Sequence, residues 1–141
     1  MNDEKKETKL VGALLVTHGK LGDELIAVTR RIVGSFNHMT AVTIGWNDDV
    51  DASESKIEKA VSSIDAGHGV IILTDMFGGT PSNISMPFQS PGKVEVITGV
   101  NLPMVVKIAS QRGDEILNVL ASKVRDQGKR QITIAGELLG E

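Results

Sequence analysis

The sequence contains no cysteine and no tyrosine, and aromatic residues make up only 3% of its 141 residues. The absence of cysteine excludes a disulfide framework, a thiolate zinc site and a cysteine nucleophile, and it fits a reducing compartment. With so few aromatic residues, a core must be built mainly from Val, Ile, Leu and Ala, which is typical of buried parallel strands covered by helices. The hydrophobic content of 40% and the charged content of 23% are those of one globular domain.

Charge and hydropathy narrow the range of partners. The formal net charge is −3, and no cluster of Lys and Arg interleaved with aromatic residues marks a surface for nucleic acid. No apolar run approaches the roughly 20 residues of a membrane span, and the charged N-terminus lacks the apolar segment of an export signal. We therefore expect a cytoplasmic protein with no nucleic-acid partner and no direct membrane insertion.

Short apolar runs rich in β-branched residues alternate with segments in which apolar residues have helical spacing. The predicted strands cover residues 10–16, 39–45, 70–74 and 94–98, with a last short strand at 131–135. The predicted helices cover residues 21–34, 50–64, 80–88, 102–110 and 115–125. This alternation predicts an α/β fold, a single doubly wound, mainly parallel sheet of four parallel strands plus a short C-terminal antiparallel strand, with helices on both faces. We expect residues 1–9 to form a flexible lead-in, residues 10–136 the domain and residues 137–141 a tail.

Polar residues lie at the carboxyl ends of the predicted parallel strands, at the edge where such sheets bind ligands. His18 follows the first strand, residues 46–49 follow the second, and Asp75 follows the third. A histidine alone is a weak signal, because His is tolerated at most partly wet positions. The signal is stronger when a carboxylate, here that of Asp75, accepts one ring N–H, because the carboxylate fixes the tautomer and directs the lone pair of the other nitrogen outward. A histidine nucleophile requires this arrangement.

Asp75 also has a purely structural interpretation, as a turn or cap residue. Thr80 is expected to cap the next helix, with Pro81 as the first helical residue, and this favours a functional role for Asp75. The other two histidines, His38 and His68, each precede a strand at the opposite edge. We expect both of them to be surface residues without a role in the site.

The segment Gly78, Gly79 and Thr80 offers backbone N–H groups at a helix start, unobstructed by side chains. Such a turn receives the oxygens of a phosphoryl group, although a simple glycine turn has the same composition. The chain has no GxxxxGK[ST] loop, no GxGxxG after the first strand and no aromatic platform for a nucleotide base. ATP is therefore not expected to be the phosphoryl donor, and neither a metal ion nor a cofactor is expected in the site.

Three motifs in order, THG at 17–19, DMFGGTPSN at 75–83 and GVNLPM at 99–104, resemble one known family. This is the EIIA component of the mannose family of the bacterial phosphoenolpyruvate-dependent sugar phosphotransferase system, and the similarity covers about residues 10–136. The resemblance implies that His18 is phosphorylated at Nε2, that Asp75 orients it, and that Thr80 lies where the family has a Ser or Thr in its glycine turn. It further implies phospho-HPr as donor, an EIIB protein as acceptor, and a homodimer that exchanges its last strand.

Three alternative functions remain to be weighed. A receiver-type signalling domain carries an acidic pair for magnesium after the first strand, where this chain has Thr17 and His18. The phosphotransferase subunit that feeds dihydroxyacetone kinase also uses a histidine after its first strand, but the motifs at 75–83 and 99–104 favour the mannose family. A regulatory module without the chemistry would lack His18 or Asp75. Both sugar uptake and its regulation are compatible with these residues.

Overall fold

The computed structural model describes residues 9–141, and it has an α/β fold with one sheet of four parallel strands in the order β2-β1-β3-β4. Apart from Lys9, the predicted lead-in lies outside the described residues. The strands are β1 (Gly12–His18), β2 (Met39–Ile44), β3 (Val70–Thr74) and β4 (Val94–Thr98). These are the four parallel strands expected from the apolar runs, except that β1 begins and ends two residues later, and β2 ends one residue earlier, than predicted. His18 is thereby the last residue of β1 and lies opposite Ile44 of β2.

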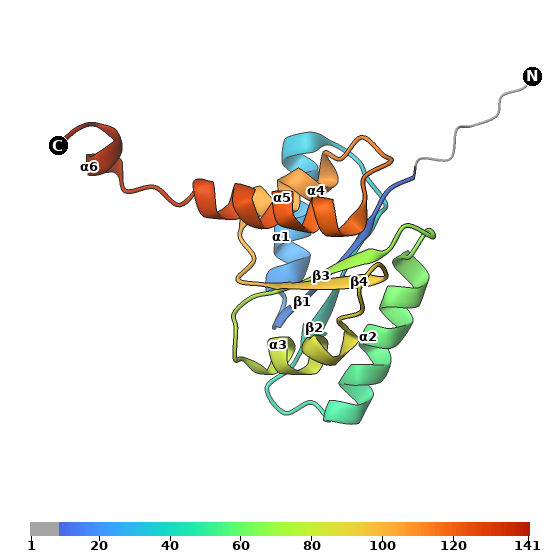
Figure 1. The fold of residues 1–141 in the computed structure, drawn as a ribbon. Helices are drawn as coiled ribbons and strands as arrows, with labels where there is room; N and C mark the ends of the chain where they lie inside the picture. The colour runs from blue at the N-terminus through green and yellow to red at the C-terminus, as the bar shows by residue number, and fades with distance from the viewer. Residues whose placement is uncertain (1–8) are drawn as a thin grey trace, which may run out of the picture.

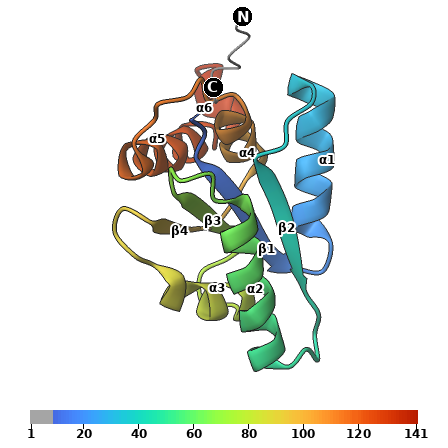
Figure 2. The same cartoon turned by 90° about the vertical axis from the view of Figure 1, so that its right-hand side faces the viewer.

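Helices cover both faces of the sheet, as the sequence predicts (Figures 1 and 2). One face is covered by α1 (Leu21–Val33), α4 (Leu102–Ala109) and α5 (Leu117–Arg130). The other face is covered by α2 (Val50–Ile64) and α3 (Thr80–Ser85), which continues into the 3₁₀-helix η1 (Met86–Phe88).

Central strand β1 divides its side chains between two separate cores. Ala13 and Leu15 pack with α1, α4 and α5, whereas Leu14 and Val16 pack with α2 and α3. Alternate residues of a strand point to opposite faces, so a strand covered on both sides is apolar throughout. This burial on both faces explains the unbroken apolar run that predicted the strand.

Helix starts show one correction to the sequence-based predictions. Asp49 and Asn101 cap α2 and α4, and their side chains accept hydrogen bonds from the backbone N–H groups of Ala52 and Met104 at 3.0 and 3.3 Å. The predicted cap at Thr80 is wrong, because Gly79 occupies the cap position of α3, Thr80 is already helical, and no side chain caps this helix. The helix therefore begins one residue earlier than Thr80 and Pro81 suggest.

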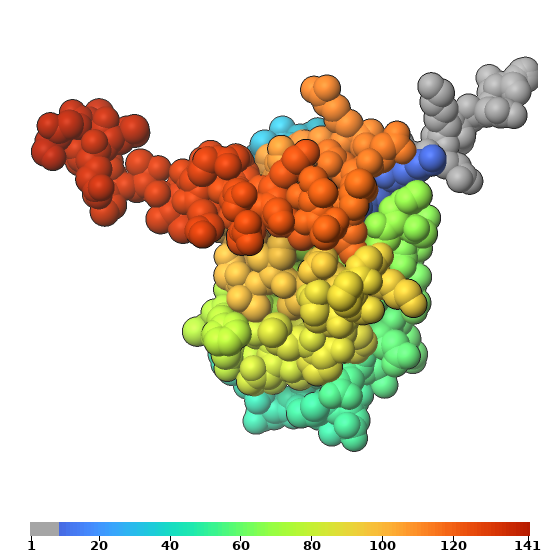
Figure 3. Space-filling view, in the orientation of Figure 1, coloured from blue at the N-terminus to red at the C-terminus, as the bar shows by residue number. Residues whose placement is uncertain are grey.

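The C-terminal region departs most from expectation. The predicted antiparallel strand at 131–135 is absent from the described chain, and these residues instead lead to a short helix, α6 (Ala135–Leu138). Figures 1 and 3 show this segment projecting from the domain, out of reach of the sheet. Helix α5 also extends five residues beyond the predicted end at 125, because Gly128 lets it pack closely on Met104 of α4.

His38 is buried rather than on the surface, so that prediction is wrong. It lies just before β2, its side chain is buried, and its Nε2 is 3.0 Å from the carbonyl oxygen of Ile108 in α4. His68 is half-buried. Among residues 9–141, no helix is both long enough and apolar enough to cross a membrane.

Candidate functional site

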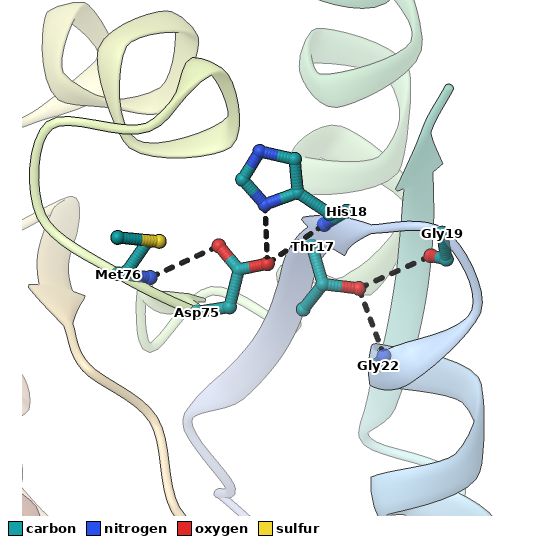
Figure 4. A network of polar contacts seen from close by, with 6 residues as sticks. All are labelled: Thr17, His18, Gly19, Gly22, Asp75 and Met76. Carbon is teal, nitrogen blue, oxygen red and sulfur yellow. Dashed lines mark hydrogen bonds and ion pairs between the residues drawn. The ribbon is translucent and has the colours of Figure 1, made fainter. Parts of the chain in front are cut away.

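His18 and Asp75 meet at the carboxyl edge of the sheet because β1 and β3 are neighbouring parallel strands. Figure 4 shows both hydrogen bonds that join them. The backbone N–H of His18 donates to Asp75 Oδ2 at 2.8 Å, and ring Nδ1 lies 2.7 Å from the same oxygen. The Met76 backbone N–H donates to the other carboxylate oxygen at 2.9 Å. The carboxylate is thus held from both sides, and the ring is tied to it.

Two opposing effects act on the pKa of Asp75. Burial of the carboxyl raises its pKa, but the hydrogen bonds from the His18 backbone and ring, the positive charge which that ring carries when it is protonated, and the hydrogen bond from the Met76 N–H together lower it below its usual value. The carboxyl is therefore ionised at neutral pH and can only accept hydrogen bonds. Nδ1 of His18 consequently carries the hydrogen, and the lone pair of the neutral ring is on Nε2.

Nε2 is the ring nitrogen of His18 that lies away from Asp75. The structure gives this atom no hydrogen bond from any of residues 9–141. The side chain of His18 is 24% exposed, whereas that of Asp75 is only 11% exposed. The carboxylate is thus largely covered, while part of the His18 side chain remains accessible, as attack on an electrophile would require.

Gly79 approaches the His18 ring so closely that a side chain at this position would press against the ring. A Cβ atom at this position would lie 2.9 Å from Cε1 and 3.6 Å from Nε2 of His18. The φ angle of Gly79 is −80°, which any residue can adopt, so it is the close approach that requires glycine. Gly78 has a φ of +87°, in the left-handed region that favours glycine. Glycine is thus favoured at the two positions for different reasons: the backbone conformation at Gly78 and the closeness of the His18 ring at Gly79.

Thr17 fixes the turn that follows β1. Its hydroxyl accepts a hydrogen bond from the Gly22 N–H at 2.8 Å and donates to the Gly19 carbonyl at 3.3 Å (Figure 4). The Gly19 N–H donates to the carbonyl of Ile44 at 3.1 Å, which ties the same turn to the end of β2. Hydrogen bonds of Thr17 and Gly19, the residues on either side of His18, thus fix the backbone around it.

Trp46 is a neighbour of His18 that belongs to the segment 46–49, which the sequence placed at this edge of the sheet without assigning Trp46 a role. Its ring is stacked on the imidazole with the two centroids 5.1 Å apart and an angle of 26° between the planes. The only available signal was its place two residues beyond Ile44, at the carboxyl end of a strand next to β1. Met76 and Phe77, in the loop after β3, are exposed apolar residues next to the Asp75 carboxylate.

The structure brings the predicted residues His18, Asp75 and Gly79 together, and places Thr80 as the exposed first residue of α3. Within residues 9–141 no three His, Cys, Asp or Glu side chains are grouped so that they can hold a metal ion. The site consists of an imidazole, a carboxylate that fixes its orientation, and a glycine turn.

Comparison with known proteins places these features in one family. The family model described as EIIA-man, PTS system fructose IIA component, matches residues 12–125. The chain is 25% identical to the PTS system fructose-specific EIIA component of Bacillus subtilis (strain 168) over 131 residues, which cover 92% of this chain and 90% of that protein. It is 31% identical over 111 residues to the PTS system mannose-specific EIIAB component of Escherichia coli (strain K12), which cover 74% of this chain and 33% of that protein.

Solved structures show the same fold. The EIIA phosphotransferase component from Streptococcus agalactiae superimposes with a TM-score of 0.80 at 21% identity, covering 91% of this chain and 99% of that one. The mannose/sorbose-specific IIA subunit from Enterococcus faecalis superimposes with a TM-score of 0.76 at 25% identity, covering 89% and 94% of the two chains.

Proposed function

The chain belongs to the EIIA-man family of the sugar phosphotransferase system, whose members are phosphotransferases in a phosphohistidine relay, and on this premise we propose that His18 carries the phosphoryl group. One observation supports the assignment above all others. The contact of 2.7 Å between Nδ1 and Asp75 Oδ2 fixes the tautomer and leaves the lone pair on Nε2. Asp75 is the residue that orients His18.

The proposed step forms one N–P bond and breaks another. The Nε2 lone pair of neutral His18 attacks the phosphorus of the donor's phosphohistidine, and the donor's ring nitrogen leaves with the electron pair of the broken bond. His18 keeps its hydrogen on Nδ1, so its ring becomes formally cationic. The ionised Asp75, already bonded to that N–H, stabilises the new charge. Transfer to the acceptor is the same step in reverse on another protein.

We place the transferred phosphoryl group beside Gly78, Gly79 and Thr80. Gly79 leaves no side chain between its backbone and the Nε2 edge of the ring. Backbone N–H groups at a turn into a helix, together with a threonine hydroxyl, suit the oxygens of a phosphoryl group. Thr80 is exposed, so its hydroxyl is free to turn toward such a ligand.

We propose protein partners for both halves of the reaction, phospho-HPr as donor and an EIIB protein as acceptor, in the cytoplasm. Trp46, Met76 and Phe77 are exposed apolar side chains in the loops that carry the site. An apolar rim of this kind around a reactive group favours docking of another protein over capture of a polar metabolite. The acceptor protein determines whether this phosphoryl transfer serves the uptake of a sugar or the regulation of that uptake.

We also propose a homodimer in which residues 131–135 add to the sheet of the partner as an antiparallel strand. Strand β4 is an edge of the sheet, and a hollow of about 450 Å³ lies between it and α5. In the single chain Ile132 and Ile134 are exposed, 76% and 67% respectively. An unpaired edge and an exposed β-branched segment are complementary, and pairing them in a symmetric dimer would cover both. The domain proposed over residues 10–136 then includes the exchanged segment, with 137–141 as a tail.

Phosphorylation by purified partners tests the assignment of His18. Phosphoenolpyruvate, enzyme I and HPr should add one acid-labile, base-stable phosphate to the wild-type chain and none to His18→Ala. His68→Ala is the matched control, because this histidine is half-buried and lies at the other end of β3, so it should label like the wild type. Labelling by acetyl phosphate and magnesium in place of HPr would instead support a receiver-type function. Undiminished labelling of His18→Ala would refute the proposal.

A further inference from the structure

The loop after β2 holds Trp46 beside His18 by its own hydrogen bonds. The Asp48 carboxylate accepts from the Gly45 N–H at 2.7 Å, and the Asp48 N–H donates back to the Gly45 carbonyl at 3.4 Å. A Cβ at Gly45 would lie 2.6 Å from the Asp48 carboxylate, so the turn is as tight as glycine allows. Trp46 is therefore carried on a closed turn rather than on an open loop.

The exposure of Trp46 is unusual for the chain's single tryptophan. Its side chain is 83% exposed, so burial in a core does not account for its position. Its ring is stacked on the His18 imidazole. Three groups thus surround His18: Asp75 at Nδ1, Gly79 at Cε1 and Trp46 at the ring face. Together they leave Nε2 open.

We propose that Trp46 is a positioning residue for phosphoryl transfer, which holds the imidazole plane of His18 and stabilises the cationic ring of the phosphorylated state. The inference rests on the proposed function of His18. It adds a residue from a third strand end to a site that otherwise comes from β1 and β3.

The physical reason is the difference between the two states of the ring. Before transfer the imidazole is neutral and gains only ordinary stacking on the indole. After transfer the ring carries a formal positive charge, which the face of an indole attracts when the centroid distance is within about 6 Å. The centroids are 5.1 Å apart. An exposed cation–π contact corresponds to roughly a two- to fivefold change in an equilibrium constant. Trp46 is therefore expected to favour the phosphorylated form by this factor.

A second role for Trp46, as part of a docking surface for HPr, makes different predictions. Docking changes the rate of transfer and the KM for HPr. It leaves unchanged the equilibrium constant that relates the free phosphorylated and unphosphorylated forms of the two proteins. An effect on the ring itself changes that equilibrium constant. The equilibrium constant is thus the measurement that separates the two roles.

The experiment compares Trp46→Phe, which keeps an aromatic face, with Trp46→Leu, which keeps apolar bulk without one. Each variant is equilibrated with HPr at a fixed ratio of phosphorylated to free HPr, and the phosphorylated fraction is measured. We expect about a two- to fivefold lower equilibrium constant for Trp46→Leu and a value within about twofold of wild type for Trp46→Phe. Phe77→Ala is the matched control: Phe77 is exposed in the neighbouring loop, so its loss should raise the KM for HPr and leave the equilibrium constant unchanged. A wild-type equilibrium constant for Trp46→Leu would overturn the proposal.

A measurement without HPr keeps this test separate from the proposed function. The ring-current field of a stacked indole should shift the carbon-bound ring protons of His18 upfield in NMR spectra, and Trp46→Leu should remove that shift. His18 protons unaffected by Trp46→Leu would refute the stacking even if His18 is phosphorylated. The wild type could instead show the upfield shift and yet not be phosphorylated by HPr. That result would refute the proposed function, and with it the stabilisation of a phosphorylated ring. Emission from the single tryptophan should also fall on phosphorylation, since a cationic imidazole quenches an excited indole.

Discussion

Alanine at position 79 would place a methyl group against the reactive ring without disturbing the local backbone. The φ and ψ of Gly79 are −80° and 167°, which alanine adopts freely. Its Cβ would meet His18 Cε1 at 2.9 Å, well inside ordinary contact distance. Because the His18 side chain is partly exposed, the ring has room to swing away. The swing would lengthen the bond of 2.7 Å from Nδ1 to Asp75 and turn Nε2 away from the glycine turn.

We expect Gly79→Ala to lower the rate of phosphoryl transfer more than the stability of the fold. Replacing glycine by alanine at a compatible conformation stabilises by about 0.4–1 kcal/mol through the unfolded state, and crowding the ring costs about 1–3 kcal/mol. The net change in the free energy of unfolding should therefore stay within about 2 kcal/mol. A reacting group displaced by roughly 1 Å loses about 10²-fold in rate, so the smaller shift needed here should slow phosphorylation by about 10- to 100-fold.

Rapid-quench phosphorylation by HPr and thermal unfolding measure the two effects separately. Gly92→Ala is the matched control, because Gly92 has a φ of +79° and nothing within 4 Å of a Cβ. That variant should lose about 1 kcal/mol of stability from backbone strain and transfer at the wild-type rate. Gly79→Ala phosphorylated at the wild-type rate would show that the close approach to His18 has no part in the reaction.

Three further predictions concern the charge at the site and the assembly. Asp75→Asn should fold normally yet slow transfer by about 10- to 100-fold, because an amide accepts the Nδ1–H bond without stabilising a cation; wild-type speed would reduce Asp75 to a turn residue. Since the folded pKa of Asp75 lies below its unfolded value, the stabilisation from its ionised form is present above the unfolded pKa and is lost as the pH falls through the folded pKa. Acid unfolding followed by circular dichroism should therefore weaken the wild type more than Asp75→Asn over that range, and parallel curves would contradict the shift. Deletion of residues 130–141 should convert a dimer into monomer or aggregate in sedimentation, whereas an intact chain that stays monomeric at micromolar concentration would refute the exchange.

The elements that depend on local pattern could be predicted from the sequence. The ranges of α2, β3 and β4 agree with the predictions, because burial on one helix face or on both faces of a strand imposes a period that is visible in the residues themselves. The pairing of His18 with Asp75 was also predictable, since parallel strands end at one edge and few ionisable residues lie there. Membership of the family followed from three motifs that lie in those same loops.

Other features depend on contacts between residues distant in the sequence, and only the tertiary structure decided them. The strand order β2-β1-β3-β4 puts β2 beside β1, and this allows the loop after β2 to bring Trp46 onto the ring of His18. The requirement for glycine at position 79 comes from the ring it approaches, because its own φ is ordinary. His38 is buried and its ring contacts the carbonyl of Ile108. The segment at 131–135 does not join the sheet of its own chain, although its residues favour a strand. Local propensity sets what a segment can form, whereas the partners available in the folded chain determine what it does form.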